Sequence, residues 1–232
     1  MGGPGHGANA VFHPRNVMNP RFAWLPEEFK ERYRWKWWRL RRLLFRPPLP
    51  QNPDGKVYLH LGCGRVNDPR CINIDAMPWP HVHYLSGVER LPMFADSSAD
   101  FIYLSHCLEH ISFGEVPAVL REWHRVLRPG GRLRLSVPDF DLIIAMYQGC
   151  DREIEPIEPP LLGGQTDAYN YHKSLYNRTR LETLLRAAGF TAVREWKPDE
   201  DDLATFDDWS RRGLPVKDKY YPISLNVEGT KP

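Results

Sequence analysis

The chain has 232 residues, which fits one α/β domain of about 180 residues plus an additional segment. Its hydrophobic content of 42% and charged content of 26% are ordinary for a globular protein. The formal net charge of only +2 argues against a general attraction to polyanions, so nucleic acid is not favoured as a partner. No run of about 18 apolar residues is present, and we expect no membrane-spanning helix.

The four cysteines indicate a reducing compartment. Cys63, Cys71, Cys107 and Cys150 show no CxxC or other zinc spacing. Two of them lie on or beside predicted strands, where a buried free thiol is the usual state. The first residues are Gly-rich and polar and lack the apolar core of a signal peptide. We therefore expect a cytoplasmic protein.

Residues 1–50 are predicted to form a loose arm followed by a basic amphipathic helix. Pro26 and the two acids after it are typical of a helix start, and Pro47 ends the helix after residue 46. One apolar stripe recurs at three- and four-residue intervals: Leu25, Phe29, Tyr33, Trp37, Leu40 and Leu44. Eight lysines and arginines surround this stripe, and two further tryptophans lie among them.

Three interpretations of the helix at residues 26–46 stay open. It packs on the following domain, with its arginines merely solvated. Alternatively, it lies on an anionic membrane surface such as the inner membrane, as basic, aromatic-rich helices do. The third interpretation is nucleic-acid binding through cations and stacking aromatics.

From residue 51 to the end, apolar runs alternate with amphipathic segments. Strands are predicted at residues 56–61, 71–75, 82–85, 101–105, 132–138, 192–196 and 223–227. Helices are predicted at residues 116–127, 139–148 with Asp139 as its cap, and 179–188 with a capping box at Thr179 and Glu182. Residues 150–177 and 197–222 are predicted as long loops. This alternation predicts a doubly wound, mostly parallel α/β sheet.

The turn after the first strand predicts a nucleoside site. The strand runs directly into Gly62-Cys63-Gly64, and glycines let the backbone approach a ligand where a side chain would block it. The second strand ends at Asp75, whose carboxylate can accept hydrogen bonds from ribose hydroxyls.

Five phrases in order then resemble one family. They are Leu-Gly-Cys-Gly at 61–64, Ile-Asn-Ile-Asp at 72–75, Leu-Pro-Met-Phe-Ala-Asp at 91–96, Ser-His-Cys-Leu-Glu-His at 105–110 and Arg-Val-Leu-Arg-Pro-Gly-Gly at 125–131. Together they resemble a class I S-adenosylmethionine-dependent methyltransferase over about residues 55–196. The resemblance implies a Rossmann-like seven-stranded sheet with helices on both faces and an antiparallel last strand. It makes residues 51–232 a methyltransferase domain with S-adenosylmethionine as its cofactor.

The resemblance also implies which residues touch the cofactor. Gly62, Cys63 and Gly64 would flank the methionine moiety, and Asp75 would hold the ribose. Val88, Glu89 and Leu91 would border the adenine, and Ser105 would line the floor beside the transferred methyl. Two positions depart from the family pattern. His60, which we also expect to touch the cofactor, replaces the usual acid two residues before the first glycine, and Ser86-Gly87-Val88 replaces an acid ahead of Leu91.

Methyl transfer to a hydroxyl requires an aligned acceptor and removal of its proton. His106 and His110 follow the fourth strand, and His172 lies in the loop at 150–177, so these three are the candidate catalytic residues. Each also has a structural interpretation, as a residue that stabilises its loop. Asp96 and Asp100 precede the fourth strand, at its wrong end for a metal near the methyl group, so no metal is predicted.

The sequence thus predicts methyl transfer to an oxygen, with nitrogen as the second choice, of a small molecule, sugar or lipid-linked acceptor. The loop at 150–177 and the N-terminal helix would form the acceptor pocket. Two alternatives stay open: an RNA methyltransferase anchored by the basic helix, and a non-catalytic scaffold with the same fold.

Overall fold

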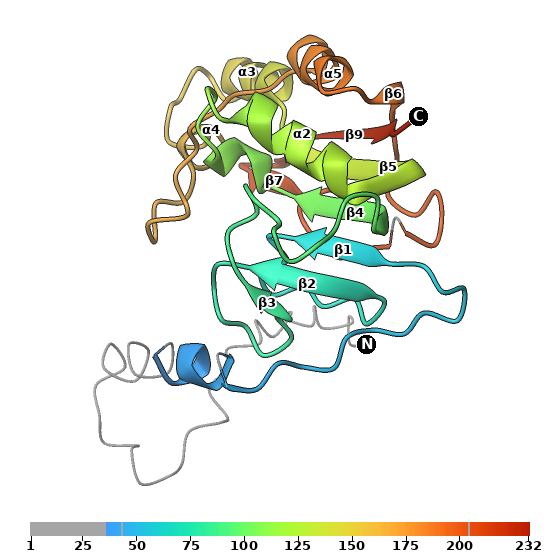
Figure 1. The fold of residues 1–232 in the computed structure, drawn as a ribbon. Helices are drawn as coiled ribbons and strands as arrows, with labels where there is room; N and C mark the ends of the chain where they lie inside the picture. Colours follow the sequence, from blue (N-terminus) through green and yellow to red (C-terminus); the bar gives the residue numbers. More distant parts are fainter. Residues whose placement is uncertain (1–35, 43, 204) are drawn as a thin grey trace, which may run out of the picture.

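The computed structural model describes residues 36–42, 44–203 and 205–232 (Figure 1). Its centre is a seven-stranded sheet with the strand order β3-β2-β1-β4-β5-β9-β6. The strands are β1 (Tyr58–Leu61), β2 (Cys71–Asp75), β3 (Tyr84–Leu85), β4 (Ala99–Ser105), β5 (Leu127–Pro138), β6 (Thr191–Glu195) and β9 (Ser224–Thr230). Only β9 runs antiparallel to its neighbours β5 and β6. The predicted Rossmann-like fold and its antiparallel last strand are confirmed.

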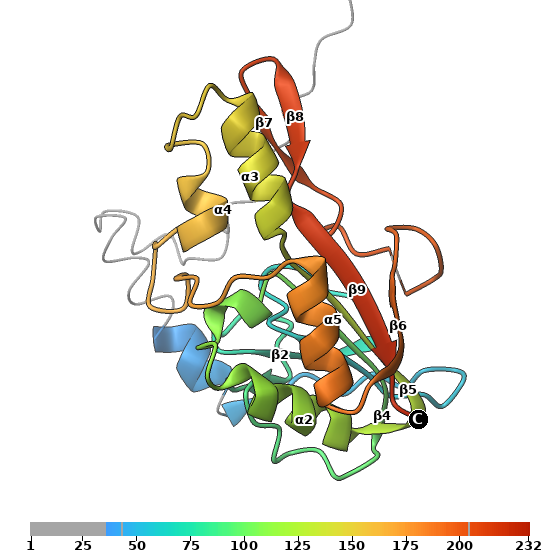
Figure 2. The same cartoon turned by 90° about the horizontal axis from the view of Figure 1, so that it is seen from above.

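The helices from residue 108 onward gather on one face of the sheet (Figure 2). They are the short 3₁₀ helix η2 (Leu108–His110), α2 (Val116–Val126), α3 (Phe140–Gly149), α4 (Glu158–Leu162) and α5 (Arg178–Ala187). The main core forms where the apolar sides of α2 and α5 pack on alternate strand residues such as Leu59, Ile102 and Leu135. Trp123 of α2 is fully buried there.

The opposite face of the sheet carries aromatic side chains. Because strand residues alternate, Tyr58, Phe101 and Tyr103 point away from α2, and they form a second cluster with Trp196 and Phe206. The ring of Phe206 stacks on that of Tyr103 at 3.8 Å between centroids. Among the described residues, this face is therefore covered by the segment after β6, not by the helices expected there.

Several predicted element boundaries are corrected. Helix α2 ends at Val126, and β5 begins at Leu127 and not at residue 132, so Pro129-Gly130-Gly131 lies in the irregular start of this strand. The cap of α5 is Asn177, whose side chain accepts from the backbone N–H of Arg180, so the predicted capping box at Thr179 is wrong. The cap at Asp139 is confirmed, since its side chain accepts from the N–H of Asp141.

The two long predicted loops contain regular structure. Helix α4 interrupts the segment 150–177, and β7 (Gly213–Val216) with β8 (Lys219–Pro222) forms a hairpin in the segment 197–222. The hairpin extends from β9 and lies beside α3 (Figure 2).

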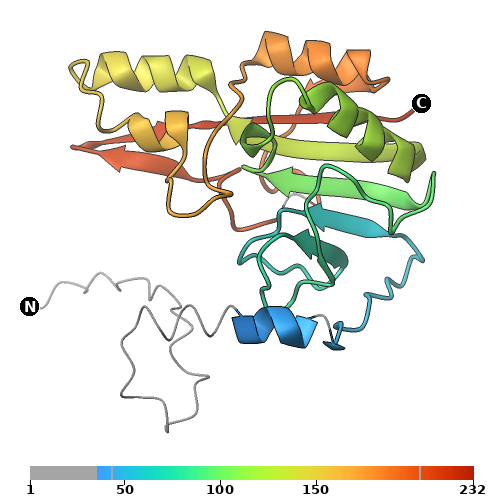
Figure 3. The same ribbon diagram turned by 60° about the vertical axis from the view of Figure 1, so that its left-hand side comes forward.

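The predicted start of the basic helix lies outside the described residues. Residues 36–42 are helical and lie beyond the β3 edge of the sheet (Figures 1 and 3). Trp37, Leu40 and Leu44 of the predicted apolar stripe are more than half exposed. None of the helices in the part of the chain that the structure describes combines the length and apolar composition needed to span a bilayer. The division into two domains at residue 50 stays a prediction.

Candidate active site

A cavity of about 490 Å³ opens at the carboxyl ends of β1 and β4. This is where open α/β sheets bind their ligands. Its lining residues come from five segments of the chain, which are residues 60–66, 105–110, 159–164, 170–172 and 207–214, and from Ile223. The predicted residues His60, Gly62, Cys63, Gly64 and Ser105 line it, together with the three predicted catalytic histidines.

The glycine turn after β1 is held close to its neighbours. Gly62 has a φ of 59°, and a Cβ there would lie 2.5 Å from the sulfur of Cys107. Gly64 has a φ of 52° and open space where its side chain would be. Left-handed backbone without a side chain leaves room for a ligand against the turn. These features fit a bound nucleoside cofactor such as the one that the motifs imply.

Asp75 at the end of β2 ties this turn in place. Its carboxylate accepts hydrogen bonds from the N–H of Gly64 at 2.7 Å and from the N–H of Met77 at 2.6 Å. Burial raises the pKa of Asp75 although these two hydrogen bonds oppose the shift. A carboxylate has about four acceptor positions, so Asp75 keeps capacity for ribose hydroxyls. It does not line the cavity itself, and its ribose contact stays a prediction.

The predicted adenine segment also lies outside the cavity wall. The carbonyl of Val88 accepts from the indole N–H of Trp123 at 2.9 Å, and the N–H of Leu91 donates to Glu122 at 2.8 Å. These bonds anchor the segment to α2. Glu89 is exposed, and its carboxylate folds back over Gly87. The adenine contacts of Val88, Glu89 and Leu91 therefore stay predictions.

His60, which replaces the acid of the family pattern, is buried between aromatic rings. Its imidazole meets Tyr103 at 5.2 Å and Phe206 at 5.1 Å between centroids. Burial lowers its pKa to about 3, so the ring is neutral. A neutral imidazole cannot form the ion pair with the cofactor's amino group that an acid would form.

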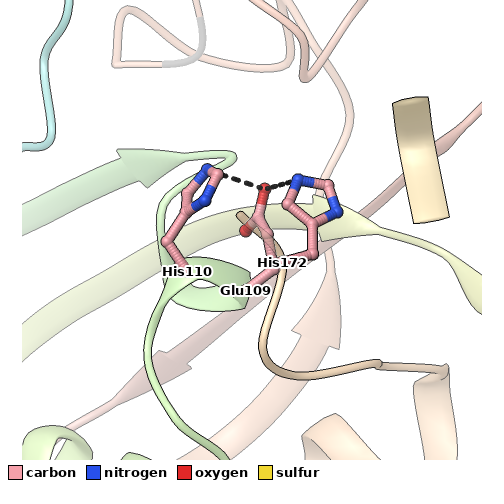
Figure 4. Close-up of side chains that lie close together, drawn as sticks. All are labelled: Glu109, His110 and His172. Carbon is pink, nitrogen blue, oxygen red and sulfur yellow. Dashed lines mark ion pairs between the residues drawn. The ribbon is translucent and has the colours of Figure 1, made fainter. Parts of the chain in front are cut away.

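The three predicted catalytic histidines converge on Glu109, which is only 1% exposed. Figure 4 shows two of them, His110 and His172, on either side of its carboxylate. Glu109 Oε1 lies 3.5 Å from His106 Nδ1, 4.0 Å from His110 Nε2 and 3.9 Å from His172 Nε2. Neither carboxylate oxygen has a hydrogen-bond partner among the described side chains and backbone groups. We call Glu109, His106, His110 and His172 the histidine–glutamate cluster.

Burial dominates the protonation of this cluster. It raises the pKa of Glu109 to about 8 and lowers that of His106 to about 3 and that of His172 to about 4. The pKa of His110 is also lowered by burial. All three imidazoles are therefore neutral near pH 7.

Sequence reasoning missed Glu109 as the centre of the cluster and missed the wall at residues 207–214. The signal for Glu109 was its place between two histidines in one short phrase. Asp208 accepts from the hydroxyl of Tyr103 at 2.7 Å, and the ring of Trp209 lies 6.0 Å from that of His106. No local pattern marks these residues, because they reach the cavity only through packing over the sheet.

Comparisons with known proteins agree with this architecture. A family model described as a methyltransferase domain matches residues 29–195. The ubiquinone/menaquinone biosynthesis C-methyltransferase of Vibrio vulnificus (strain YJ016) is 34% identical over 118 residues, which are 47% of this chain and 44% of that protein. The corresponding Haemophilus ducreyi protein is 29% identical over 121 residues, 49% of this chain and 46% of that protein. The match thus spans less than half the length of these relatives.

Among solved structures, the 1,6-didemethyltoxoflavin-N1-methyltransferase of Burkholderia thailandensis was crystallised with 1,6-didemethyltoxoflavin and S-adenosylhomocysteine. It aligns with a TM-score of 0.50 and 19% identity over 88% of this chain and 83% of that chain, which supports the fold. Because the family model covers most of the chain and the motifs and fold agree with it, the chain belongs to the class I S-adenosylmethionine-dependent methyltransferases, and S-adenosylmethionine is its cofactor.

Proposed function

We propose that this enzyme methylates an oxygen of a small molecule, sugar or lipid-linked acceptor bound in the 490 Å³ cavity. The observation that carries this proposal is that the histidine–glutamate cluster and the glycine turn at Gly62–Gly64 line the same cavity. A cofactor on the turn and a hydroxyl on the cluster would then face one another across a short distance.

When bound, S-adenosylmethionine supplies a methyl group on a positively charged sulfur. The chain then has to bind the acceptor, align it and help to remove its proton. The neutral imidazoles of His106, His110 and His172 can accept hydrogen bonds from an acceptor hydroxyl. Their low pKa values make them weak bases, so binding and orienting the acceptor is their main role.

Carbon is the second candidate atom, because the relatives that match half of this chain are named C-methyltransferases. A phenol ring held by its hydroxyl on the same cluster would present an activated carbon beside the methyl group. Methylation of oxygen gives a product with a new carbon–oxygen bond, and methylation of carbon gives one with a new carbon–carbon bond.

An assay with S-adenosylmethionine labelled with ¹³C in the methyl group separates them. The enzyme is incubated with panels of sugars, lipid-linked glycans and phenols, and the product is examined by ¹³C NMR. A methoxy resonance is the expected result. A methyl resonance on carbon or nitrogen would overturn the oxygen assignment.

Cofactor binding is tested with Asp75→Asn. Loss of the anionic acceptor should weaken binding of S-adenosylhomocysteine by about 1–3 kcal/mol in calorimetry, since charge-assisted hydrogen bonds and the anchor of the turn are both lost. The matched control is Asp96→Asn, whose side chain is 78% exposed and pairs with Arg125 outside the cavity. Equal affinity of the Asp75 variant and wild type would refute the ribose assignment.

We also propose that the basic helix contacts an anionic membrane surface. In its described part, Trp37 and Leu40 are exposed, and the Arg41 guanidinium lies 5.4 Å from the Trp37 ring. Exposed aromatics beside cations suit the interface of an anionic bilayer. In a co-sedimentation assay, the protein should pellet with phosphatidylglycerol vesicles at low salt and stay in the supernatant at high salt. Retention by RNA and not by these vesicles would overturn this proposal.

A further inference from the structure

We propose that Glu109, His110 and His172 bind one divalent transition-metal ion in the cavity. One ligand atom from each residue lies within 4.8 Å of the other two (Figure 4). Ligands about 2.0–2.2 Å from a shared ion stand about 3–3.6 Å apart. The distances of 3.9 and 4.0 Å from Glu109 Oε1 to the two imidazoles need only a small closure to reach that range.

The hydrogen bonds on the outer side of these imidazoles leave their inner nitrogens free to bind an ion. His110 Nδ1 lies 3.1 Å from the carbonyl of Tyr171, and His172 Nδ1 lies 3.1 Å from the carbonyl of Pro160. A carbonyl only accepts hydrogen bonds, so each Nδ1 carries the proton of its neutral ring. Each Nε2 therefore presents a lone pair toward Glu109, as metal-binding histidines do.

His106 also presents an unprotonated nitrogen to Glu109, but here Nε2 carries the proton and Nδ1 faces the carboxyl group. The hydroxyl of Ser224 donates to the carbonyl of Trp209 at 2.7 Å, so it accepts from His106 Nε2 at 2.8 Å. The Nδ1 of His106 is then an unprotonated nitrogen 3.5 Å from Glu109 Oε1. Three imidazole lone pairs thus converge on the Glu109 carboxyl, an arrangement in which a cation can take the place of the carboxyl proton.

Glu109 supplies a second, independent observation. Its carboxylate is almost fully buried, and both oxygens lack partners among the described residues. An unpaired buried carboxylate is costly, and buried charges are normally paired or coordinate a metal. Binding an ion would satisfy this carboxylate without moving any strand.

The ligand types indicate the class of ion. Two imidazoles and one carboxylate suit Zn²⁺, Fe²⁺ or Mn²⁺, whereas Mg²⁺ prefers oxygen ligands and water. Three protein ligands leave at least one coordination position open, as in catalytic sites. The prediction of no metal considered only Asp96 and Asp100, and it did not consider imidazole ligands brought together from η2 and the loop at residue 172.

The role of the ion rests on the proposed function. An acceptor hydroxyl bound at the open position would lose its proton to water more readily, because a metal ion lowers the pKa of a bound oxygen. The acceptor oxygen then forms its bond to the methyl carbon while the carbon–sulfur bond breaks and its electron pair passes to sulfur. Such activation compensates for histidines that are weak bases.

Direct binding tests the ion site. The full chain is treated with a chelator and dialysed, then titrated with Zn²⁺, Mn²⁺ and Mg²⁺ in a calorimeter and with Co²⁺ by visible absorption. Wild type should bind one Zn²⁺ or Mn²⁺ per chain and bind Mg²⁺ weakly. Glu109→Gln and His172→Asn should each weaken Zn²⁺ binding by about 100-fold or more, since each removes a direct ligand.

The matched control is His124→Asn. His124 lies on α2 outside the cavity. Within the described part of the chain, its buried Nε2 also has no hydrogen-bond partner, but no group of metal-ligand atoms includes it. Zn²⁺ affinity of this variant should equal that of wild type. Binding of S-adenosylhomocysteine, measured on every variant, verifies that each one is folded.

The outcomes separate the two proposals. Absence of Zn²⁺, Mn²⁺ and Co²⁺ binding in a wild-type chain that binds S-adenosylhomocysteine would overturn the ion site and leave the methyl-acceptor proposal intact. Unchanged Zn²⁺ affinity in Glu109→Gln would overturn it as well. A product methylated on carbon, with intact ion binding, would overturn the oxygen acceptor alone.

Discussion

Two buried ionisable groups in this molecule differ in how they are paired. The Arg134 guanidinium on β5 is fully buried and bonds to Glu228 of β9 at 2.7 and 2.9 Å, to Asp201 at 2.9 Å and to Glu200 at 3.1 Å. Arg134 and Glu228 are also direct partners in the strand register. The Glu109 carboxylate is just as buried, yet it has no hydrogen-bond partner among the described residues.

The difference separates a structural charge from a functional one. A buried charge with a full set of partners holds elements together, here β5, β9 and the segment after β6. A buried charge without partners destabilises the fold unless something else binds it. Because Glu109 lies on the wall of the cavity, its carboxyl is open to the ion that we propose, whereas the fold itself supplies the partners of Arg134.

The strongest test of this comparison is Arg134→Met. The change leaves the nearly buried Glu228 carboxylate without its main partner, so the free energy of unfolding should fall by about 3–5 kcal/mol. Urea denaturation followed by circular dichroism measures this loss. A fall of less than about 1 kcal/mol would mean that the Arg134 network contributes little to stability.

His60 extends the comparison to a buried group that stays neutral. Its folded pKa of about 3 lies below the unfolded value of 6.5, so the unfolded state takes up a proton first as the pH falls. Stability is therefore full above pH 6.5 and is lost progressively between 6.5 and 3. From pH 7 to pH 5, this one group should account for about 2 kcal/mol of that loss.

The variant His60→Phe keeps an aromatic ring and removes the titration. Its stability should decline less steeply than that of wild type over the same pH range in urea denaturation. Parallel curves for the two proteins would show that His60 is protonated in the folded state or accessible to water.

Glu109→Gln should have a much smaller effect on folding than Arg134→Met. In the presence of a chelator, the variant should be within about 1 kcal/mol of wild type or more stable, because the substitution replaces a largely protonated carboxyl, whose oxygens lack hydrogen-bond partners among the described residues, by a neutral amide of similar size. Thermal unfolding at neutral pH measures the difference. A large destabilisation would show that the Glu109 carboxylate has a structural partner and would break the contrast with Arg134.

The smallest effect is expected for an exposed ion pair. Arg178 is half exposed and pairs with Glu182 one turn along α5 and with Glu195 of β6. Arg178→Ala should cost about 0.5 kcal/mol or less, because water screens both pairs. It also serves as the reference for Arg134→Met, and equal losses in the two variants would contradict the importance of burial.

Local patterns in the sequence were sufficient for the positions of the strands along the chain and for the glycine turn, but not for the order in which the strands pair. Buried parallel strands are short apolar runs, and the turn at Gly62–Gly64 needs residues without a Cβ, so both can be recognised directly in the amino-acid sequence. The cap at Asp139 is equally local. The hairpin β7–β8 was missed because Lys217, which has a φ of 54°, and Asp218 stand where hairpin turns usually carry Asn-Gly or Asp-Gly.

The amino-acid sequence by itself thus determined the family, the cofactor and the sheet, since these depend on neighbours in the chain. It also marked His106, His110 and His172 as candidates. Only the tertiary structure placed these three histidines around Glu109 and supplied the carbonyls that accept from His110 and His172 and the Ser224 hydroxyl that accepts from His106. Those contacts join η2 to a loop some sixty residues later in the chain. Packing on the sheet brings such distant residues together, and it produces no periodic pattern in the sequence by which they could be recognised.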